Sequence, residues 1–116
     1  MTVAESINLA VQRLVKSARP MKVILFGSHA TGAVTEESDL DLLVVEREVP
    51  SKVKEMVRLR EAVGSIGLPV DVIVCSEQEL EDWGHLPGTV LYWALKEGKV
   101  LYEQQSAYRS SEGKDR

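Results

Sequence analysis

The sequence is poor in cysteine, in basic residues and in long apolar runs, and each shortage excludes a class of protein. Cys75 is the single cysteine among 116 residues, so the chain cannot form an internal disulfide. Proteins without disulfides are typical of reducing compartments, and we therefore expect a cytoplasmic protein. Cys75 lies in the apolar run of residues 72–75 and is expected to be a small core residue.

Basic residues are outnumbered by acidic ones. The chain has 14 lysines and arginines against 18 aspartates and glutamates, which gives a net charge of -4 at pH 7. Domains that bind a phosphate backbone usually carry a basic face. The charge therefore disfavours nucleic acid as a partner and favours a small nucleotide that binds together with a metal ion.

Long apolar segments are also missing. The longest uninterrupted apolar run, residues 90–95, is far shorter than the ~18 residues that a membrane-spanning helix needs. No basic-then-apolar leader opens the sequence, so we expect a soluble, unexported protein with no membrane partner. The length suits one domain over residues 1–103, and the polar residues 104–116 are expected to form a mobile tail.

Local patterns predict helices that alternate with short strands. Thr2 and Glu5 match a capping box before an amphipathic helix that ends ahead of Pro20, and Ser76 and Glu79 match a second capping box. Further helices are predicted at residues 51–63, 77–83 and 88–96. Strands are predicted at residues 22–26, 39–46 and 70–75, and residues 99–102 are expected to be extended.

The predicted helix at residues 51–63 can connect two parallel strands, because a parallel crossover needs about a dozen or more residues. The side of this helix that its apolar residues mark carries Val53, Met56, Val57, Arg60 and Val63. The strands at 39–46 and 70–75 are therefore expected to be parallel neighbours. The link from Gly27 to Asp39 is shorter and rich in glycine, which favours an antiparallel pair.

Together these elements predict an α/β (α+β) fold with a small mixed sheet of three or more strands and flanking helices. The strand directions bring the end of the first strand beside the starts of the next two. Small and acidic residues then meet at one edge of the sheet, namely Gly27, Ser28, Asp39, Asp41 and Asp71.

Asp39 and Asp41 point to the same face of their strand, because side chains alternate along a strand. Two adjacent carboxylates repel unless a cation or a shared proton offsets the cost. Mg²⁺ suits this role because it prefers oxygen ligands and is commonly held by one or two carboxylates plus substrate phosphates, and Mn²⁺ suits it as well.

Asp71 adds a third carboxylate at the start of the next strand. Three carboxylates can hold two metal ions, of which one activates an attacking oxygen and the other neutralises a leaving pyrophosphate. Asp71 is the candidate for accepting the proton of the attacking hydroxyl. Gly27 allows the backbone to approach a phosphate closely, and Ser28 adds a hydroxyl donor.

At these residues the chain resembles the nucleotidyltransferase superfamily that includes polymerase beta and kanamycin nucleotidyltransferase, whose signature is Gly-Ser, a spacer and then Asp-x-Asp. Its length is most similar to the minimal nucleotidyltransferase group, often encoded as the antitoxin of a HEPN-family toxin. The resemblance implies a polymerase beta-like fold, ATP and Mg²⁺, with Asp39, Asp41 and Asp71 as catalytic metal ligands and Gly27 and Ser28 as nucleotide-binding residues. It further implies adenylylation of a tyrosine on the toxin.

The chain departs from this pattern at two positions. Many members carry arginines one and three residues after the serine, where this chain has His29 and Thr31. We expect His29 to be an exposed turn residue, with contact to phosphate as the alternative. The departure leaves substrate preference and turnover rate open.

Three functions compete on these residues. The first is an enzyme that moves AMP from ATP to a protein hydroxyl and acts as an antitoxin. The second is a weak or inactive antitoxin that neutralises its partner by binding alone, and the third is transfer to a small molecule or to a nucleic-acid end. The apolar run 90–95 also predicts that the helix at 88–96 contacts a toxin or a second copy of the chain.

Overall fold

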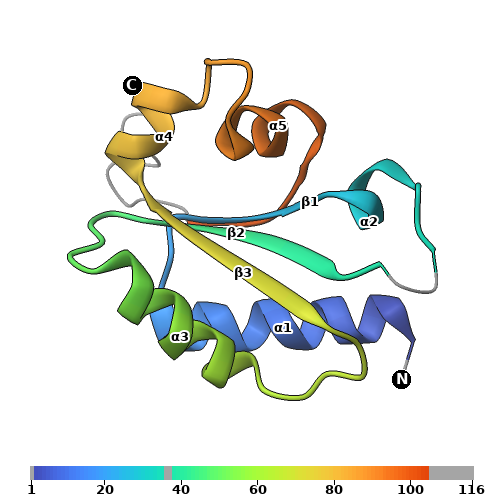
Figure 1. Ribbon diagram of the computed structural model, residues 1–116. Coiled ribbons are helices and arrows are strands. Elements are labelled where there is room, and N and C mark those ends of the chain that lie inside the picture. The colour runs from blue at the N-terminus through green and yellow to red at the C-terminus, as the bar shows by residue number, and fades with distance from the viewer. Residues whose placement is uncertain (1, 36–37, 105–116) are drawn as a thin grey trace, which may run out of the picture.

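The computed structural model describes residues 2–35 and 38–104. In this part of the chain, helices cover both faces of one mixed sheet, which confirms the predicted fold class (Figure 1). The elements in chain order are α1 (Val3–Ala18), β1 (Lys22–Phe26), α2 (Ser28–Thr31), β2 (Leu40–Glu46), α3 (Lys52–Val63), β3 (Val70–Ser76), α4 (Glu77–Trp83), α5 (Val90–Glu97) and β4 (Lys99–Glu103).

The sheet has the strand order β3-β2-β1-β4. β1 pairs antiparallel with β2, and β2 pairs parallel with β3, so both predicted directions are confirmed. The segment that the sequence indicated only as extended is a strand, β4, which pairs antiparallel with β1. The parallel pair is possible because α3 carries the chain back across one face of the sheet.

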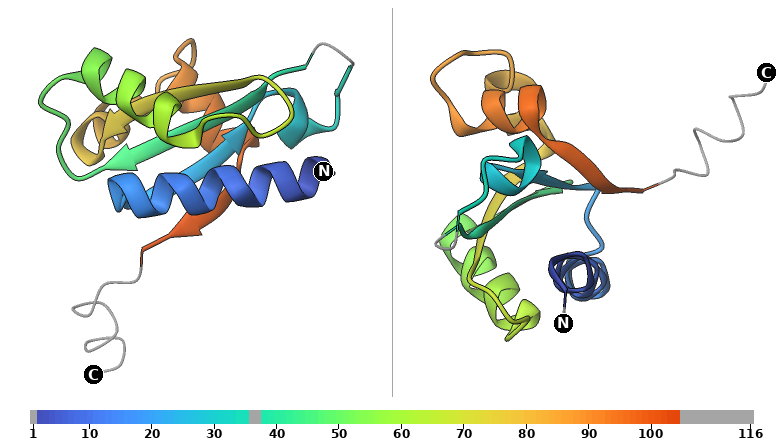
Figure 2. Two further views of the ribbon diagram at one scale, coloured as in Figure 1. Left: turned by 90° about the horizontal axis from the view of Figure 1, so that it is seen from below. Right: turned by 90° about the vertical axis from the view of Figure 1, so that its right-hand side faces the viewer.

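Two apolar layers hold the helices on the sheet. α1 and α3 lie on one face, and α4 and α5 lie on the other (Figure 2). Leu14 of α1 and Leu59 of α3 are fully buried against the first face. Ala94 of α5 packs on the second face with Cys75, whose predicted place in the core is confirmed. Burial raises the pKa of the Cys75 thiol to about 12, so this side chain is an inert packing residue.

α1 begins where its sequence predicts. The Thr2 N–H donates to Glu5 Oε1 at 2.7 Å, and the Glu5 N–H donates to Thr2 Oγ1 at 3.1 Å, which together form the expected capping box. The helix ends at Ala18, and Arg19 caps it in the left-handed conformation with φ 46° just before Pro20.

The buried side of α3 differs from the predicted one. Val53 and Val57 are 72% and 51% exposed, whereas Leu59 and Val63 are buried and Met56 is partly buried. The inward side chains thus follow positions 56, 59 and 63, which is helical spacing shifted from the stripe that the valines suggested. Packing against α1 and the sheet therefore determines which apolar side of α3 is buried.

Two shorter elements also differ from their predicted form. The turn expected after Gly27 is a four-residue helix, α2. α5 begins at Val90 rather than at 88, because Thr89 caps it by accepting the Tyr92 N–H at 3.1 Å. Gly88 has φ 98° and therefore lies outside the helix.

The predicted tail falls almost wholly outside the described residues. Of residues 104–116 only Gln104 is described, and its N–H donates to the Met21 carbonyl at 2.9 Å. The mobility of the tail and the domain boundary at residue 103 stay predictions. Among residues 2–35 and 38–104, no helix is both long and apolar enough to cross a bilayer.

A carboxyl group is enclosed where β2 leaves the sheet. Glu46 lies beside Glu55 of α3, and its Oε2 is buried without a hydrogen-bond partner among the described residues. Arg58 donates to both oxygens of Glu55, at 2.9 and 2.7 Å, and to the Ser17 carbonyl at the end of α1. Burial, and then contact with Glu55, raises the pKa of Glu46 to about 8.

This carboxyl makes stability depend on pH. The pKa of folded Glu46 exceeds its ordinary value of 4.5. Its stabilising contribution to the free energy of unfolding is therefore fully present below pH 4.5 and is lost as the pH rises through about 8. We expect Glu46→Gln to be more stable relative to wild type at pH 8 than at pH 5, as measured by urea unfolding. The exposed neighbour Glu48 supplies the control, Glu48→Gln. Parallel pH profiles of wild type and Glu46→Gln would show that Glu46 is not enclosed in this way.

Candidate functional site

Three strands bring their ends together at one edge of the sheet. Phe26, the last residue of β1, pairs with Asp41 of β2, and Asp41 in turn pairs with Asp71 of β3. This register follows from the directions of the strands, because β1 ends where β2 and β3 begin. Residues far apart in the sequence, at 27, 41 and 71, are thereby placed side by side.

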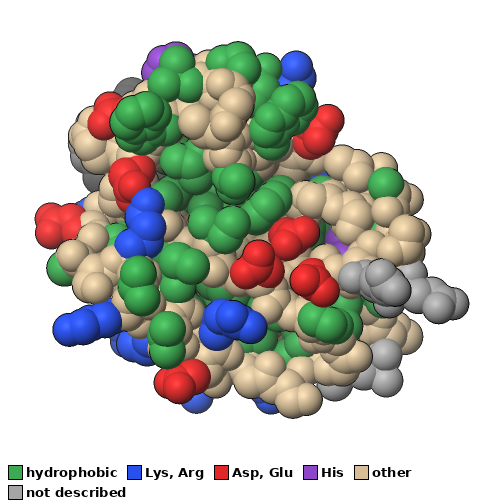
Figure 3. Space-filling view, in the orientation of Figure 1, with side chains coloured by type: hydrophobic (Ala, Val, Ile, Leu, Met, Phe, Trp, Pro, Cys, Tyr) green, Lys and Arg blue, Asp and Glu red, His purple; other side chains and the backbone are tan. Residues whose placement is uncertain are grey.

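The two paired acids leave the same face of the sheet. Leu40 and Leu42 are buried in the layer under α1 and α3, so Asp41 between them points to the opposite face. Asp71 points to that face as well, because its neighbours Val70 and Val72 pack in the α1 and α3 layer. This is the face that α4 and α5 partly cover, and in Figure 3 acidic side chains gather there beside a stretch of hydrophobic ones.

Asp39 lies one residue before β2 and is exposed. The predicted strand began at Asp39, so the observed strand is one residue shorter. Although Asp39 lies outside the strand, its negative charge still raises the pKa of the Asp41 carboxyl. The sequence therefore grouped the three acids correctly, while their roles in catalysis and metal binding remain predictions.

The negative charges of Asp39 and Asp71 act on the carboxyl group of Asp41. Burial raises the pKa of the Asp41 carboxyl, and the negative charges of Asp71 and Asp39 raise it further. His29 opposes the shift because its positive form attracts the carboxylate. Ionised Asp41 is thus held in an unfavourable place, and a bound cation would relieve it.

The donor set fits a hard divalent cation. Carboxylate oxygens are the preferred ligands of Mg²⁺ and suit Mn²⁺, and a cation would offset the repulsion that raises the Asp41 pKa. Among residues 2–35 and 38–104, however, no three acidic, histidine or cysteine side chains already converge on one ligand position. The metal-ligand role expected of Asp39, Asp41 and Asp71 stays a prediction.

Gly27 lies directly against the carboxylate of Asp41. Its backbone has φ 76° and ψ -157°, a conformation that side chains rarely adopt. A Cβ atom at this position would collide with Asp41 Oδ2. Glycine is therefore required here by the backbone conformation, and the absence of a side chain leaves room for the Asp41 carboxylate.

α2 follows Gly27 at once and places its first turn beside the acids. The Gly27 carbonyl accepts the N–H groups of Ala30 and Thr31, at 3.0 and 3.1 Å. The first N–H groups of a helix, here those of Ser28 and His29, have no partner within the helix and suit a phosphate group. The nucleotide-binding role of Gly27 and Ser28 stays a prediction, and this arrangement is compatible with it.

His29 differs from its predicted state. The sequence indicated an exposed turn residue, whereas the structure places it in α2, partly buried, with Nε2 enclosed and without a hydrogen-bond partner among the described residues. An enclosed polar atom without a partner costs about 1–3 kcal/mol. No local sequence signal could have revealed this burial, because it depends on how α2 packs on β1 and β2.

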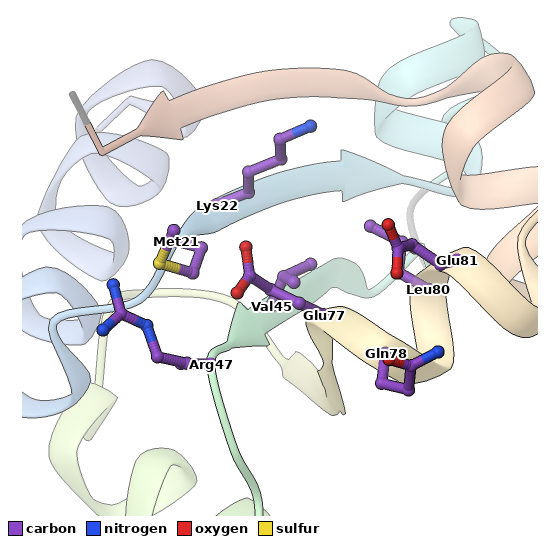
Figure 4. Close-up of a pocket in the computed structure, with 8 residues that line it drawn as sticks. All are labelled: Met21, Lys22, Val45, Arg47, Glu77, Gln78, Leu80 and Glu81. Atoms are coloured by element: carbon purple, nitrogen blue, oxygen red, sulfur yellow. The ribbon is translucent and has the colours of Figure 1, made fainter. Parts of the chain in front are cut away.

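A cavity of about 410 Å³ lies at the opposite end of the sheet (Figure 4). It lies between α4 and the start of β1, and its apolar lining residues are Met21, Val45 and Leu80. Lys22 and Glu77 are among the charged residues that line it. The cavity shares no residue with the acidic edge, the sheet edge that carries Asp39, Asp41 and Asp71. The candidate site is therefore the surface beside Gly27 and not this cavity.

Comparisons of sequence with known proteins agree with the geometry. The family model described as "Polymerase beta, Nucleotidyltransferase" matches residues 10–107. Two relatives come from Methanocaldococcus jannaschii. "Putative protein adenylyltransferase MJ0604" is 35% identical over 72% of this chain and 80% of its own length. "Putative protein adenylyltransferase MJ0141" is 38% identical over 46% of this chain, and the match spans about half, 52%, of that relative.

Solved structures share the fold at low sequence identity. A spectinomycin adenyltransferase from Enterococcus faecialis, solved with ATP and spectinomycin, aligns with a TM-score of 0.63 at 21% identity, over 90% of this chain and 58% of its own. A toxin-antitoxin structure solved with AMP-PNP aligns with a TM-score of 0.51 at 20% identity, over 83% and 73%. With its strand order, its acidic edge and its match over residues 10–107, the chain belongs to the polymerase beta nucleotidyltransferase family.

Proposed function

We propose that this chain transfers AMP from ATP to a hydroxyl group of a protein. The observation that carries the proposal is the contact of Gly27 with Asp41, which in turn pairs with Asp71, in a member of a nucleotidyltransferase family. The names of the two relatives as protein adenylyltransferases support a protein acceptor.

The residues at the acidic edge have separate tasks in this reaction. The backbone at Gly27 and the hydroxyl of Ser28 hold the triphosphate, and Asp39 and Asp41 hold the metal ions together with Asp71. When bound, two divalent cations would increase the reactivity of the attacking oxygen and neutralise the leaving pyrophosphate.

The chemical step joins the acceptor oxygen to the α-phosphorus of ATP. The bond from the α-phosphorus to the bridging oxygen of the β-phosphate breaks, and pyrophosphate leaves with the electron pair. Asp71 is the proposed acceptor of the proton from the attacking hydroxyl, because it is the exposed acid paired with Asp41.

The proposed acceptor is a tyrosine of a HEPN-family toxin, so that the chain acts as an antitoxin. A toxin-antitoxin complex among the structural neighbours supports a protein partner. Large apolar side chains are exposed along residues 83–95, on the face that carries the acids, including Trp83 at 52% and Trp93 at 46%. We propose this surface, which includes α5, as the partner contact.

A second function, neutralisation by binding alone, has one observation in its favour. No lysine or arginine of the described residues is among the groups that shift the Asp41 pKa, where many family members place arginines close to the serine. A catalytically weak antitoxin that uses the same surface to occlude its partner is consistent with this lack of strong positive charge.

Intact mass spectrometry separates the two functions. The full chain is incubated with ATP, Mg²⁺ and the protein encoded by the adjacent gene, and the mass of that protein is measured. We expect added AMP units, which disappear when Asp39→Ala and Asp41→Ala are combined. Unchanged mass, with neutralisation preserved in the double variant, would establish occlusion instead.

A further inference from the structure

The imidazole of His29 is the polar group of the site that the structure leaves without a role. Its Nε2 is buried and makes no hydrogen bond to any described residue. Nearly all buried polar atoms in native proteins have a hydrogen-bond partner, and an unpaired one often marks a catalytic role or the place of an ion or a water molecule. The unpaired Nε2 therefore indicates that a bound ligand could supply its hydrogen-bond partner.

The position of His29 suggests where that partner comes from. His29 is the second residue of α2, two residues after Gly27 in the turn that contacts the Asp41 carboxylate. It is also the basic group whose charge acts on Asp41. α2 packs against β1 and β2, the strands beside Gly27 and Asp41, so it lies next to a nucleotide whose α-phosphate binds at Asp41 and Asp71.

We propose that His29 Nε2 donates a hydrogen bond to the β- or γ-phosphate of bound ATP and thereby positions the triphosphate. This inference rests on the proposed function, because it requires ATP at the acidic edge. The neutral imidazole with its proton on Nε2 is sufficient as donor. The ring must turn about its side-chain bonds when the nucleotide enters, and exchanging an unpaired buried nitrogen for a charge-assisted hydrogen bond favours this movement.

The proposal separates triphosphate from nucleoside recognition. A histidine that contacts only the β- or γ-phosphate adds to the affinity for ATP and not to the affinity for AMP. A histidine that merely supports the packing of α2 would affect both ligands equally, together with stability. The ratio of the two affinities is therefore the informative quantity.

The test uses the full chain and calorimetric titration with Mg²⁺ and either ATP or AMP. We expect His29→Ala to weaken ATP about tenfold, the effect of losing one hydrogen bond to a charged group, and to leave AMP binding unchanged. In His29→Gln the side-chain amide can take the place of Nε2, so this variant should keep most of the affinity for ATP. His29→Asn, whose amide lies nearer the backbone, should behave as His29→Ala does.

The matched control is His85→Ala, in the exposed loop between α4 and α5, which should bind both nucleotides as wild type does. Equal losses for ATP and AMP, or an unchanged ATP affinity in His29→Ala, would overturn the role of His29 while leaving the proposed function standing. A wild-type chain that binds no ATP in the presence of Mg²⁺ would overturn both.

Discussion

Asp41→Asn is expected to reduce nucleotidyl transfer by about a thousandfold, the scale on which a single group that stabilises transition-state charge contributes to rate. Asp41 is the acid at the centre of the edge, paired with Asp71 and in contact with Gly27. Asparagine keeps the shape of the side chain but removes the charge that attracts a cation. Transfer is measured with ATP that carries a radiolabelled α-phosphate.

The same variant should not lose stability at neutral pH. The pKa of folded Asp41 is raised above its ordinary value of 3.8, so the contribution of this group is present below pH 3.8 and is lost as the pH rises through the folded pKa. At pH 7 the ionised Asp41 carboxylate therefore destabilises the folded protein. Asp41→Asn should unfold at an equal or higher urea concentration than wild type. The control Asp82→Asn, on the exposed surface of α4, should keep full transfer. Loss of stability in step with activity would mean that Asp41 is structural.

Gly27→Ala is expected to lower the free energy of unfolding by about 3 kcal/mol, because a strained backbone conformation and an overpacked contact add. The new Cβ collides with Asp41 Oδ2 at a backbone angle φ of 76°. Relief of the collision must move the Asp41 carboxylate out of its place. We therefore expect ATP binding to be lost together with stability, as measured by urea unfolding and calorimetry.

Gly32 provides the matched control for this variant. It also has a positive φ, 90°, but a Cβ there meets no atom within 4 Å. Gly32→Ala should therefore cost about 1 kcal/mol from the backbone alone and should leave ATP binding unchanged. Equal losses of unfolding free energy and of ATP binding in the two variants would show that the contact between Gly27 and Asp41 contributes nothing beyond the backbone strain.

Most of the fold could be predicted because its signals are local. Two capping boxes mark the starts of α1 and α4, and short apolar runs mark three of the strands. The directions of β2 and β3 followed from the length of the connection that contains α3. β4 was left as an extended segment, because its pairing with β1 joins residues that are far apart in the sequence.

The grouping of the three acids could also be predicted from local signals. The burial of individual polar side chains near the sheet could not. Asp39 and Asp41 are two residues apart, and side-chain alternation along a strand predicts that they lie on one face. The parallel connection between β2 and β3 places Asp71 beside Asp41. The burial of His29 and of Glu46 depends on α2 and α3 packing against the sheet, which no short pattern encodes. Packing likewise decided that Leu59 rather than Val53 faces the core.

The most direct test of the acidic edge as a nucleotidyltransferase centre is a crystal structure of the full chain with Mn²⁺ and a non-hydrolysable ATP analogue. Anomalous scattering locates the manganese independently of the surrounding atoms. We expect manganese among the carboxylates of Asp39, Asp41 and Asp71, with the triphosphate against Gly27 and Ser28. Nucleotide and metal bound elsewhere, for example in the cavity at Met21 and Leu80, would contradict the assignment of the site.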